Sequence, residues 1–380
     1  MRISRPALLD RLDSALEASP SRVPVLLGAC GTGRSSVLLD LQQRLGSEQC
    51  QYVDLERSAT TPERFHRGLC LSSPFVAGDV PLAAPTPRAA FDATLAFLTG
   101  ARLPDGSPAT FLLDEALEFR TFENFPGLRQ VLRDLLAAIA GSTNRFVLTT
   151  RYVARALRLL RDAAPRFEVL QIPPLGVDEV REALGEVPGT FNADDSARAV
   201  HALTEGHVGH ASVVLEAMAA LGQQGGSDPV SALAAQMEPG ATLASRIAWC
   251  YELRLHRARG YGALKGILGI LAEEEPLTLT EIALRLQRTP GSTKDYLSWL
   301  EDVDLVTVRQ KRYSVADPLV RLWVRLHCRP IPPSEDEIAS EVHQYALARL
   351  PHAEPVMAMA GAAGGGGDDD RKTWGIIEID

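Results

Sequence analysis

The residues with the clearest chemical meaning form a glycine-rich loop near the start of the sequence. The loop has the pattern G-x-x-x-x-G-[K/R]-[S/T], and its residues are Gly28, Ala29, Cys30, Gly31, Thr32, Gly33, Arg34 and Ser35. Glycines at these positions let successive backbone N–H groups curl around a phosphate, and a helix that starts here adds the positive end of its dipole. The Ser35 hydroxyl is the expected Mg²⁺ ligand, and Ser36 extends the same site. The pattern predicts binding of ATP or ADP, and a glycine-rich turn without a ligand is the alternative.

Position 34 departs from the common form of this pattern, because Arg stands where Lys is expected. Arginine keeps the positive charge, but its planar fork differs in shape and hydrogen bonding from a compact ammonium group. We therefore expect nucleotide binding to survive, with Arg34 as a candidate catalytic residue. Whether hydrolysis survives is open at this point, and hydrolysis that does survive is expected to be slow.

A pair of acidic residues, Asp114 and Glu115, directly follows the apolar run Phe111-Leu112-Leu113. In P-loop NTPases an aspartate at a strand end holds Mg²⁺. A neighbouring glutamate can act as a general base on the attacking water. We expect Asp114 to be the metal-linked acid and Glu115 the general base. A strand end that is merely acidic is the alternative, and the position of the pair after the glycine-rich loop favours the chemical interpretation.

Short apolar runs alternate with helical patterns over residues 1–174, which predicts βαβ units and a parallel sheet. Strands are expected at residues 23–27, 51–55, 110–113, 145–150 and 167–172. Helices then predict a small lid, and two helices, a turn, a third helix and a hairpin predict a winged helix-turn-helix. The expected fold is α/β, and its parts are a parallel-sheet P-loop NTPase core (1–174), a helical lid (175–238), a winged helix domain (239–330) and a flexible acidic tail with a terminal peptide (331–380).

The order of these motifs resembles the AAA+/STAND superfamily of P-loop ATPases, and within it the archaeal-type and NB-ARC-like members with a C-terminal winged helix. Beyond the loop and the acidic pair, the resemblance lies in FVLTTR at 146–151, QIPPLGVDE at 171–179, EGHVGH at 205–210, and DPL at 317–319 with Trp323. It implies that Thr149 senses the γ-phosphate and that Arg151 contacts a nucleotide phosphate. It also implies an ATP-binding molecular switch with slow Mg²⁺-dependent hydrolysis. Val208 departs from the family, which has Pro at that position.

The expected winged helix allows two roles. A DNA-contacting helix at residues 292–300 would offer Lys294 and Tyr296, and the hairpin would offer Arg309, Lys311 and Arg312. Basic side chains of this kind contact DNA phosphates. The other role is a surface that reports the nucleotide state to a protein partner. The functional alternatives are therefore a DNA-binding AAA+ ATPase, such as a loader or a regulator of transposition or replication, and a nucleotide-bound scaffold that does not hydrolyse ATP.

Composition limits the remaining possibilities. The chain has 380 residues, a formal net charge of −9 and 46% hydrophobic residues. The acidic balance excludes a uniformly basic nucleic-acid coat, although a local basic patch is compatible with it. Five cysteines without a C-x-x-C pair argue against a disulfide framework, and Cys30 inside the loop would make nucleotide binding sensitive to oxidation. We find no signal peptide and no apolar run long enough to cross a bilayer, so a cytoplasmic protein is expected.

Two further segments carry weaker predictions. His201, His207 and His210 lie close together in the sequence, but no carboxylate or cysteine follows at ligand spacing, so packing is expected rather than metal binding. The segment from Trp374 to Asp380 is apolar and follows a glycine-rich stretch. Such a segment can add a strand to a partner. The partner would be a second copy of this chain or another protein, and an end without a role is the alternative.

Overall fold

A five-stranded parallel sheet organises the first half of the chain. The structure, a computed structural model, describes residues 3, 5–76, 78, 80–161, 163–185, 192–222, 228–255, 258 and 260–350. The strand order is β2-β3-β4-β1-β5. The strands are β1 (Val23–Leu27), β2 (Cys50–Asp54), β3 (Thr110–Asp114), β4 (Arg145–Thr150) and β5 (Phe167–Gln171). Every neighbouring pair is parallel, so the expected α/β class is confirmed.

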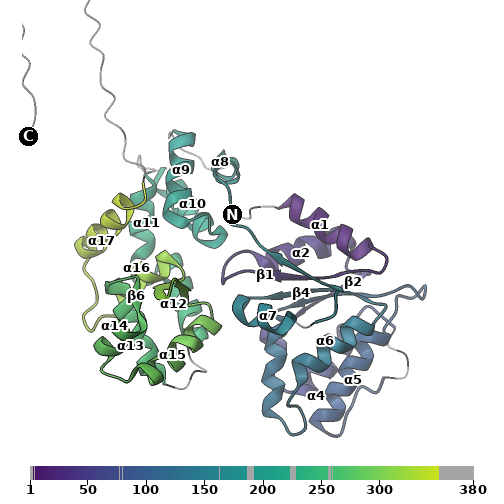
Figure 1. Ribbon diagram of the computed structural model, residues 1–380. Coiled ribbons are helices and arrows are strands. Elements are labelled where there is room, and N and C mark those ends of the chain that lie inside the picture. Colours follow the sequence, from purple (N-terminus) through teal and green to yellow (C-terminus); the bar gives the residue numbers. More distant parts are fainter. Residues whose placement is uncertain are drawn as a thin grey trace, which may run out of the picture.

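Helices cover both faces of this sheet. Leu26, Leu112 and Val147 share a buried cluster with residues of α1 and α2, whereas Leu27, Phe111 and Phe146 point into the larger cluster on the opposite face. Side chains alternate across a strand, so apolar residues at successive positions produce a sheet that is buried on both sides. Figure 1 shows α1 and α2 on one face and α4, α5 and α6 on the other. The helices of this half are α1 (Pro6–Glu17), α2 (Arg34–Leu45), α3 (Leu55–Ser58), α4 (Pro62–Leu71), α5 (Pro87–Gly100), a 3₁₀ helix (Ala116–Asn124), α6 (Val131–Gly141) and α7 (Val153–Leu160).

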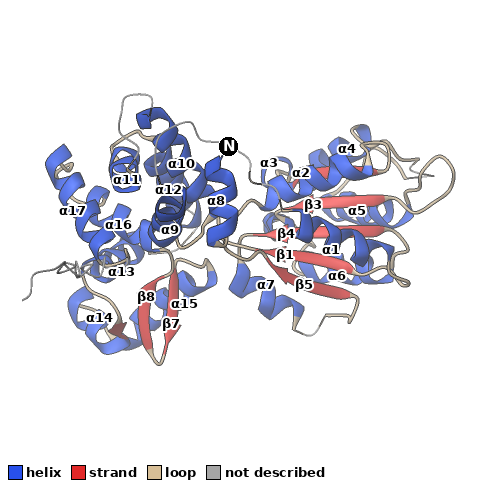
Figure 2. Ribbon diagram, turned by 90° about the horizontal axis from the view of Figure 1, so that it is seen from above, coloured by secondary structure: helices blue, strands red, loops and turns tan. Residues whose placement is uncertain are grey.

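The lid helices, as we call α8 to α11, stand beside the carboxyl edge of the sheet (Figure 2). Their bounds are α8 (Val177–Gly185), α9 (Ala193–Thr204), α10 (Val208–Gly222) and α11 (Pro229–Met237). A close backbone contact fixes the turn before α10. Gly206 has φ of +69° and accepts a hydrogen bond from the Leu175 N–H at 2.7 Å, and a Cβ at Gly206 would meet the Leu175 oxygen at 2.3 Å. Only glycine fits there without displacing backbone.

The remaining elements form the C-terminal unit, defined as α12 to α16 with the strands between them. They are α12 (Thr242–Leu255), α13 (Tyr261–Glu273), β6 (Leu277–Thr278), α14 (Leu279–Leu286), α15 (Pro290–Asp302), β7 (Val306–Arg309), β8 (Arg312–Val315) and α16 (Pro318–His327). The antiparallel sheet has the order β6-β8-β7. The expected turn before the third helix is its first turn instead, because Thr289 caps α15 and Pro290 occupies its first position. The winged-helix assignment itself stays a prediction.

The flexible acidic tail does not begin at residue 331 as expected. Residues Glu335–Leu347 form α17, and a capping box joins Ser334 to Glu337 at its start. Ile338, Val342 and Ala346 are buried at helical spacing, and α17 packs against α11 and α16. The acidic first turn suits a helix N-terminus. The terminal segment from Trp374 to Asp380 lies outside the described residues.

Membrane-crossing helices are not found in the described part of the chain, where every helix is too short or too polar to span a bilayer.

Candidate functional site

The glycine-rich loop, residues 28–35, connects the end of β1 to the start of α2. Gly31 and Gly33 adopt φ angles of +82° and +89°, in the left-handed region that favours glycine. A Cβ at Gly28 would lie 2.4 Å from the Thr32 hydroxyl oxygen. That hydroxyl donates a hydrogen bond to the Ala29 oxygen at 2.9 Å, which closes the loop. The positive φ angles at Gly31 and Gly33 and the close contact at Gly28 therefore favour glycine at all three positions.

Arg34 turns back from the first position of α2 into this loop. Its side chain is only 7% exposed. One terminal nitrogen donates to the oxygens of Gly28 and of Ala29, the latter at 2.5 Å. The other donates to the Glu115 Oε1 atom at 2.5 Å. The guanidinium thus bridges the loop and the acidic pair, a two-sided contact that the planar fork of arginine permits.

Glu115, the expected general base, is held on more than one side. It has φ of +55° directly after β3, and its backbone N–H donates to the Thr149 hydroxyl oxygen at 3.0 Å. Its Oε2 atom accepts from the backbone N–H of Arg151 at 3.0 Å, and the Arg151 guanidinium lies 3.2 Å from Oε1. In this arrangement the carboxylate is occupied by Arg34 and Arg151 rather than free to accept a proton from water.

Ser35 and Asp114, the two expected metal ligands, meet at the hydroxyl of Tyr52. The Tyr52 hydroxyl donates to the Asp114 Oδ2 atom at 2.7 Å and also hydrogen-bonds with Ser35. Burial and the Asp114 carboxylate together raise the pKa of Tyr52, which stays protonated. Hydroxyl and carboxylate oxygens are donors that Mg²⁺ prefers, so the residues present fit that ion. Tyr52 was not expected at the site, because only the pairing of β2 with β3 brings it beside Asp114.

Thr149 and Arg151, expected to contact nucleotide phosphates, lie within the same network but do not line the main cavity described below. The Thr149 hydroxyl donates to the Asp114 Oδ1 atom, and the residue is fully buried. Arg151 is paired with Glu56 as well as Glu115. Burial alone would lower the pKa of Arg151, but the two carboxylates outweigh it and raise the pKa. Both residues position the acidic pair in this structure.

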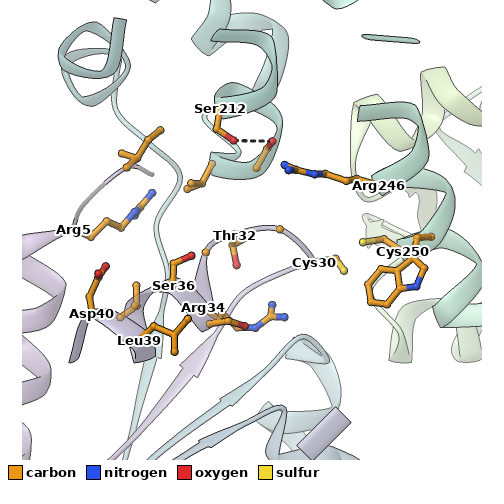
Figure 3. A pocket seen from close by; sticks show the side chains of 18 of the residues that line it. Arg5, Cys30, Thr32, Arg34, Ser36, Leu39, Asp40, Ser212, Arg246 and Cys250 are labelled. Atoms are coloured by element: carbon orange, nitrogen blue, oxygen red, sulfur yellow. Dashed lines mark hydrogen bonds between the residues drawn. The ribbon is translucent and has the colours of Figure 1, made fainter. Parts of the chain in front are cut away.

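A cavity of about 810 Å³ opens over the loop (Figure 3). Its size is that of a ligand pocket. Its floor includes residues 30–36, which are seven of the expected nucleotide contacts, together with Leu39 and Asp40 of α2. The opposite walls come from Val208, Gly209 and Ser212 of α10 and from Ser245, Arg246, Trp249 and Cys250 of α12. Gly28 and Ala29 do not line it. The cavity therefore lies between the sheet domain, the lid helices and the C-terminal unit.

The cavity residues that were not expected from the sequence include Arg5, Arg246 and Trp249. Arg5 is 7% exposed and donates to the Pro173 oxygen at 2.7 Å. Its Nε and second terminal nitrogen have no hydrogen-bond partner among the described residues. Arg246 and Trp249 are exposed, and Figure 3 shows the Arg246 guanidinium extending toward the cavity from α12. No local signal marks them, because their role depends on where α12 packs.

The start of α10 is joined to the loop by backbone and histidine contacts. The Gly209 N–H donates to the Gly31 oxygen at 2.9 Å, and the His207 Nε2 atom lies 2.8 Å from the Cys30 oxygen. His210 stacks on His207 with ring centroids 3.8 Å apart, and its Nε2 atom lies 3.7 Å from Asp317. Burial lowers the pKa of both histidines, that of His210 to about 3, so both are neutral. Asp317 was not expected beside these histidines, because it lies far from them in the sequence.

The comparisons with known proteins concern the fold. No protein-family model matches the sequence, and no curated protein matches it. Among solved structures, the Walker-type ATPase of Pyrococcus abyssi is similar with a TM-score of 0.60 and 17% identity, over 85% of this chain and 96% of that chain. Two single-residue mutants of Thermotoga maritima RuvB have TM-scores of 0.42 and 0.41 and identities of 15% and 14%, over 82% and 83% of this chain and 92% and 93% of theirs. With its parallel sheet and the glycine-rich loop after β1, the chain has the α/β fold of P-loop ATPases.

Proposed function

We propose that the protein is an ATP-binding molecular switch of the AAA+/STAND type, with slow Mg²⁺-dependent hydrolysis of ATP to ADP and phosphate. The observation that carries the proposal is the position of the cavity. Its floor is the glycine-rich loop, and its opposite wall is α12 of the C-terminal unit. A nucleotide on the loop would therefore touch both halves of the chain. Differential contact of this kind is what lets a ligand shift a conformational equilibrium.

Binding would use the backbone N–H groups of the glycine-rich loop and the start of α2 for the phosphates. Ser35 and Asp114 would hold Mg²⁺, whose charge would neutralise phosphate oxygens. Arg246 and the partly unpartnered Arg5 add positive charge around the cavity. The exposed ring of Trp249 offers a flat surface for the base, since aromatic rings stack on bases.

Slow hydrolysis follows from the state of Glu115. A general base must accept a proton from the attacking water, and here both carboxylate oxygens are engaged by Arg34 and Arg151. Arg34 would have to leave Glu115 to contact a phosphate. Nucleotide binding and activation of the base would thus be coupled through one side chain. The contacts that hold Glu115 also support the alternative of a scaffold that does not hydrolyse ATP.

The C-terminal unit, which we propose to be a winged helix, is connected to the sheet domain beside the cavity. The Asp304 carboxylate accepts the backbone N–H groups of Val153 and Ala154 at 2.6 and 3.2 Å, at the start of α7. Arg158 of α7 pairs with Asp302 at 2.5 Å. Because Arg254 of α12 donates to the backbone carbonyl oxygen of Asp304 at 3.2 Å, movement of α12 would reach this junction. We propose that the junction transmits the nucleotide state to a partner surface.

Titration with fluorescent ATP and ADP, with and without Mg²⁺, tests the binding step. We expect Arg34→Ala to weaken binding at least ten-fold, because it removes the only guanidinium inside the loop. Arg44→Ala is the matched control, since Arg44 lies on the same helix but pairs on the surface with Asp10 and Asp13. Equal affinity of the wild type and Arg34→Ala, or no binding by the wild type, would refute the proposed site.

A DNA-contacting role is the second candidate, because four basic side chains of α15 and the hairpin are exposed: Lys294, Arg309, Lys311 and Arg312. Each phosphate contact adds about 0.9 to the slope of log affinity against log salt. Four contacts would give a slope of about −3.6 for duplex DNA. A salt series with ATP, with ADP and without nucleotide distinguishes the roles. Binding that is absent at low salt in all three states would leave only the protein-partner role.

A further inference from the structure

Two cysteines meet across the cavity from opposite halves of the chain. Cys30 belongs to the glycine-rich loop and Cys250 to α12, and both line the main cavity and a smaller one of about 110 Å³ beside it. Figure 3 shows their sulfur atoms pointing toward one another. The two thiols are hydrogen-bonded to each other. Both residues are free and half-buried, and the hydrogen bond between them places the two sulfur atoms in contact.

The surroundings make the two thiols chemically different. The hydrogen bond from Cys250 and the nearby guanidinium groups of Arg254, Arg151 and Arg34 outweigh burial and lower the pKa of Cys30. A lowered pKa favours the thiolate, which is the reactive form of cysteine. The same hydrogen bond and burial raise the pKa of Cys250, which keeps its proton.

The other cysteines lack this setting. Burial raises the pKa of Cys50 to about 11, and it also raises the pKa values of Cys70 and Cys328. A low thiol pKa, partial exposure and an adjacent second thiol are the features of a redox-sensitive cysteine. Among the five cysteines, these features coincide only at Cys30.

We propose that Cys30 and Cys250 are an oxidation site for peroxides, and that a disulfide between them ties the glycine-rich loop to α12. In the first step the Cys30 thiolate attacks hydrogen peroxide, the O–O bond breaks, and Cys30 becomes a sulfenic acid while the departing hydroxide takes a proton to give water. In the second step the Cys250 sulfur attacks the Cys30 sulfur. The S–O bond breaks, and the hydroxyl group leaves as water with the Cys250 proton. In total, two thiols are oxidised and one peroxide is reduced to two waters.

The disulfide would control movement between the two halves. It would fix the loop to the helix that forms the opposite wall of the cavity. The two walls could then not separate to let nucleotide enter or leave. Slower nucleotide exchange is the expected consequence, and this consequence alone rests on the proposed function. Formation of the disulfide does not depend on nucleotide binding.

Peptide mapping of the full chain tests the disulfide. Reduced protein is treated with hydrogen peroxide in the presence of a metal chelator, blocked with N-ethylmaleimide, digested with trypsin and analysed by mass spectrometry without reduction. Cleavage after Arg22, Arg34, Arg246 and Arg254 places the two cysteines alone in peptides 23–34 and 247–254. We expect these two peptides to be linked in the wild type and in Cys328→Ser, and unlinked in Cys250→Ser.

The same experiment also defines the results that would contradict the disulfide. A natively folded wild type in which Cys30 is oxidised to sulfinic acid, or not oxidised at all, without a link to peptide 247–254 would overturn the proposal. Circular dichroism of each variant before oxidation controls for loss of fold, and Cys250→Ala repeats the test with a smaller apolar side chain.

Release of fluorescent ADP tests the control of exchange. We expect release from the linked wild type to be at least ten-fold slower than from the reduced protein, with recovery after dithiothreitol. Linked protein that releases ADP at the reduced rate would overturn this control. If neither form binds nucleotide while the peptides are linked, the proposed function fails and the oxidation site stands.

Discussion

At the scale of single residues, Arg34 joins the glycine-rich loop to the acidic pair. Its guanidinium contacts the oxygens of the glycine-rich loop on one side and the Glu115 carboxylate on the other. A compact ammonium could not make both contacts in the same way, because lysine presents a point charge and arginine a fork. Under the proposed function, the residue at position 34 would therefore determine how firmly Glu115 is held before ATP binds.

Arg34→Lys is expected to raise the rate of ATP hydrolysis at least ten-fold, with ATP affinity within a few-fold of the wild type. The lysine keeps a positive charge for the phosphates, while Glu115 loses the arginine fork and keeps only its contacts to Arg151. Single-turnover phosphate release measures the effect, and Arg44→Lys is the control on the same helix. An unchanged or lower rate would mean that Arg34 does not restrain the base.

Glu115→Gln is expected to reduce phosphate release by about 10² or more, the range of a positioned general base. Binding of ATP should persist, because the amide keeps a hydrogen-bond acceptor for Arg151 and removes one negative charge near the phosphates. Parallel binding and turnover measurements separate the two effects. Equal phosphate release by the wild type and this variant would show that Glu115 is not the base.

Local motifs made part of this site predictable. The glycine spacing of residues 28–35 and the acidic pair after an apolar run are visible in the sequence because each is a short continuous segment. Tyr52, Arg5 and Arg246 are not visible in this way. Tyr52 acquires its place from the β2–β3 pairing, and Arg246 from the packing of α12 against the loop. Contacts between distant segments carry no signature in a single sequence.

At the scale of elements, the start of α10 is the point where the lid helices, the loop and α16 meet. His207 contacts the Cys30 oxygen, and His210 lies beside Asp317, whose other carboxylate oxygen caps α16. Four titratable or charged groups affect His210: His207, Asp317, Arg246 and Arg254. Burial keeps both histidines neutral, so the stability of the junction decreases at a pH low enough to favour their protonation.

Acidification is expected to destabilise the fold through this junction. The pKa of His210 is about 3 in the fold, against 6.5 for a free histidine, so between these values the unfolded state binds more protons. The free energy of unfolding therefore falls as the pH drops below about 6.5, by up to about 1.4 kcal/mol per pH unit for one histidine. His210→Gln should reduce the loss in melting temperature between pH 7.5 and 5.5. His343→Gln, an exposed histidine on α17, is the control, and equal losses in wild type and His210→Gln would contradict the prediction.

Helix α17 shows why an acidic composition does not by itself predict a flexible tail. The acidic residues near position 335 suggest a solvated tail, but they lie in the first turn of a helix, where negative charge is favourable. The capping box at Ser334 and the apolar spacing of Ile338, Val342 and Ala346 were the local signals for it. By contrast, the parallel sheet was predictable, because its apolar runs alternate regularly with helices.

Ile338→Ala is expected to lower the free energy of unfolding by about 2–4 kcal/mol, the cost of a cavity where a buried isoleucine was. Ile338 is 2% exposed and lies on α17, which packs against α11. Ile331→Ala is the matched control, because Ile331 is 78% exposed and close in the sequence. Denaturant unfolding measures both. Similar small effects of the two substitutions would mean that α17 contributes little to the folded protein.

At the scale of the whole molecule, the cavity is the place where the two halves of the chain can respond to one ligand. Its floor belongs to the sheet domain and its far wall to α12, so a ligand that fills it would contact both. The contact of Asp304 with the start of α7 gives a second connection between the same halves. A ligand that contacts both halves stabilises the arrangement in which they are close.

The rate of hydrogen exchange should therefore decrease upon ADP binding in two separate regions, the glycine-rich loop with α2 and the helix α12. Arg246→Ala is expected to remove the protection of α12 while keeping that of the loop, because Arg246 extends into the cavity from α12 and the loop holds the phosphates independently. Arg285→Ala, which removes a surface arginine of α14 that pairs with Glu274, should leave both regions protected. Protection confined to the loop in the wild type would mean that the nucleotide does not engage the C-terminal unit. The switch would then need a route other than the cavity wall.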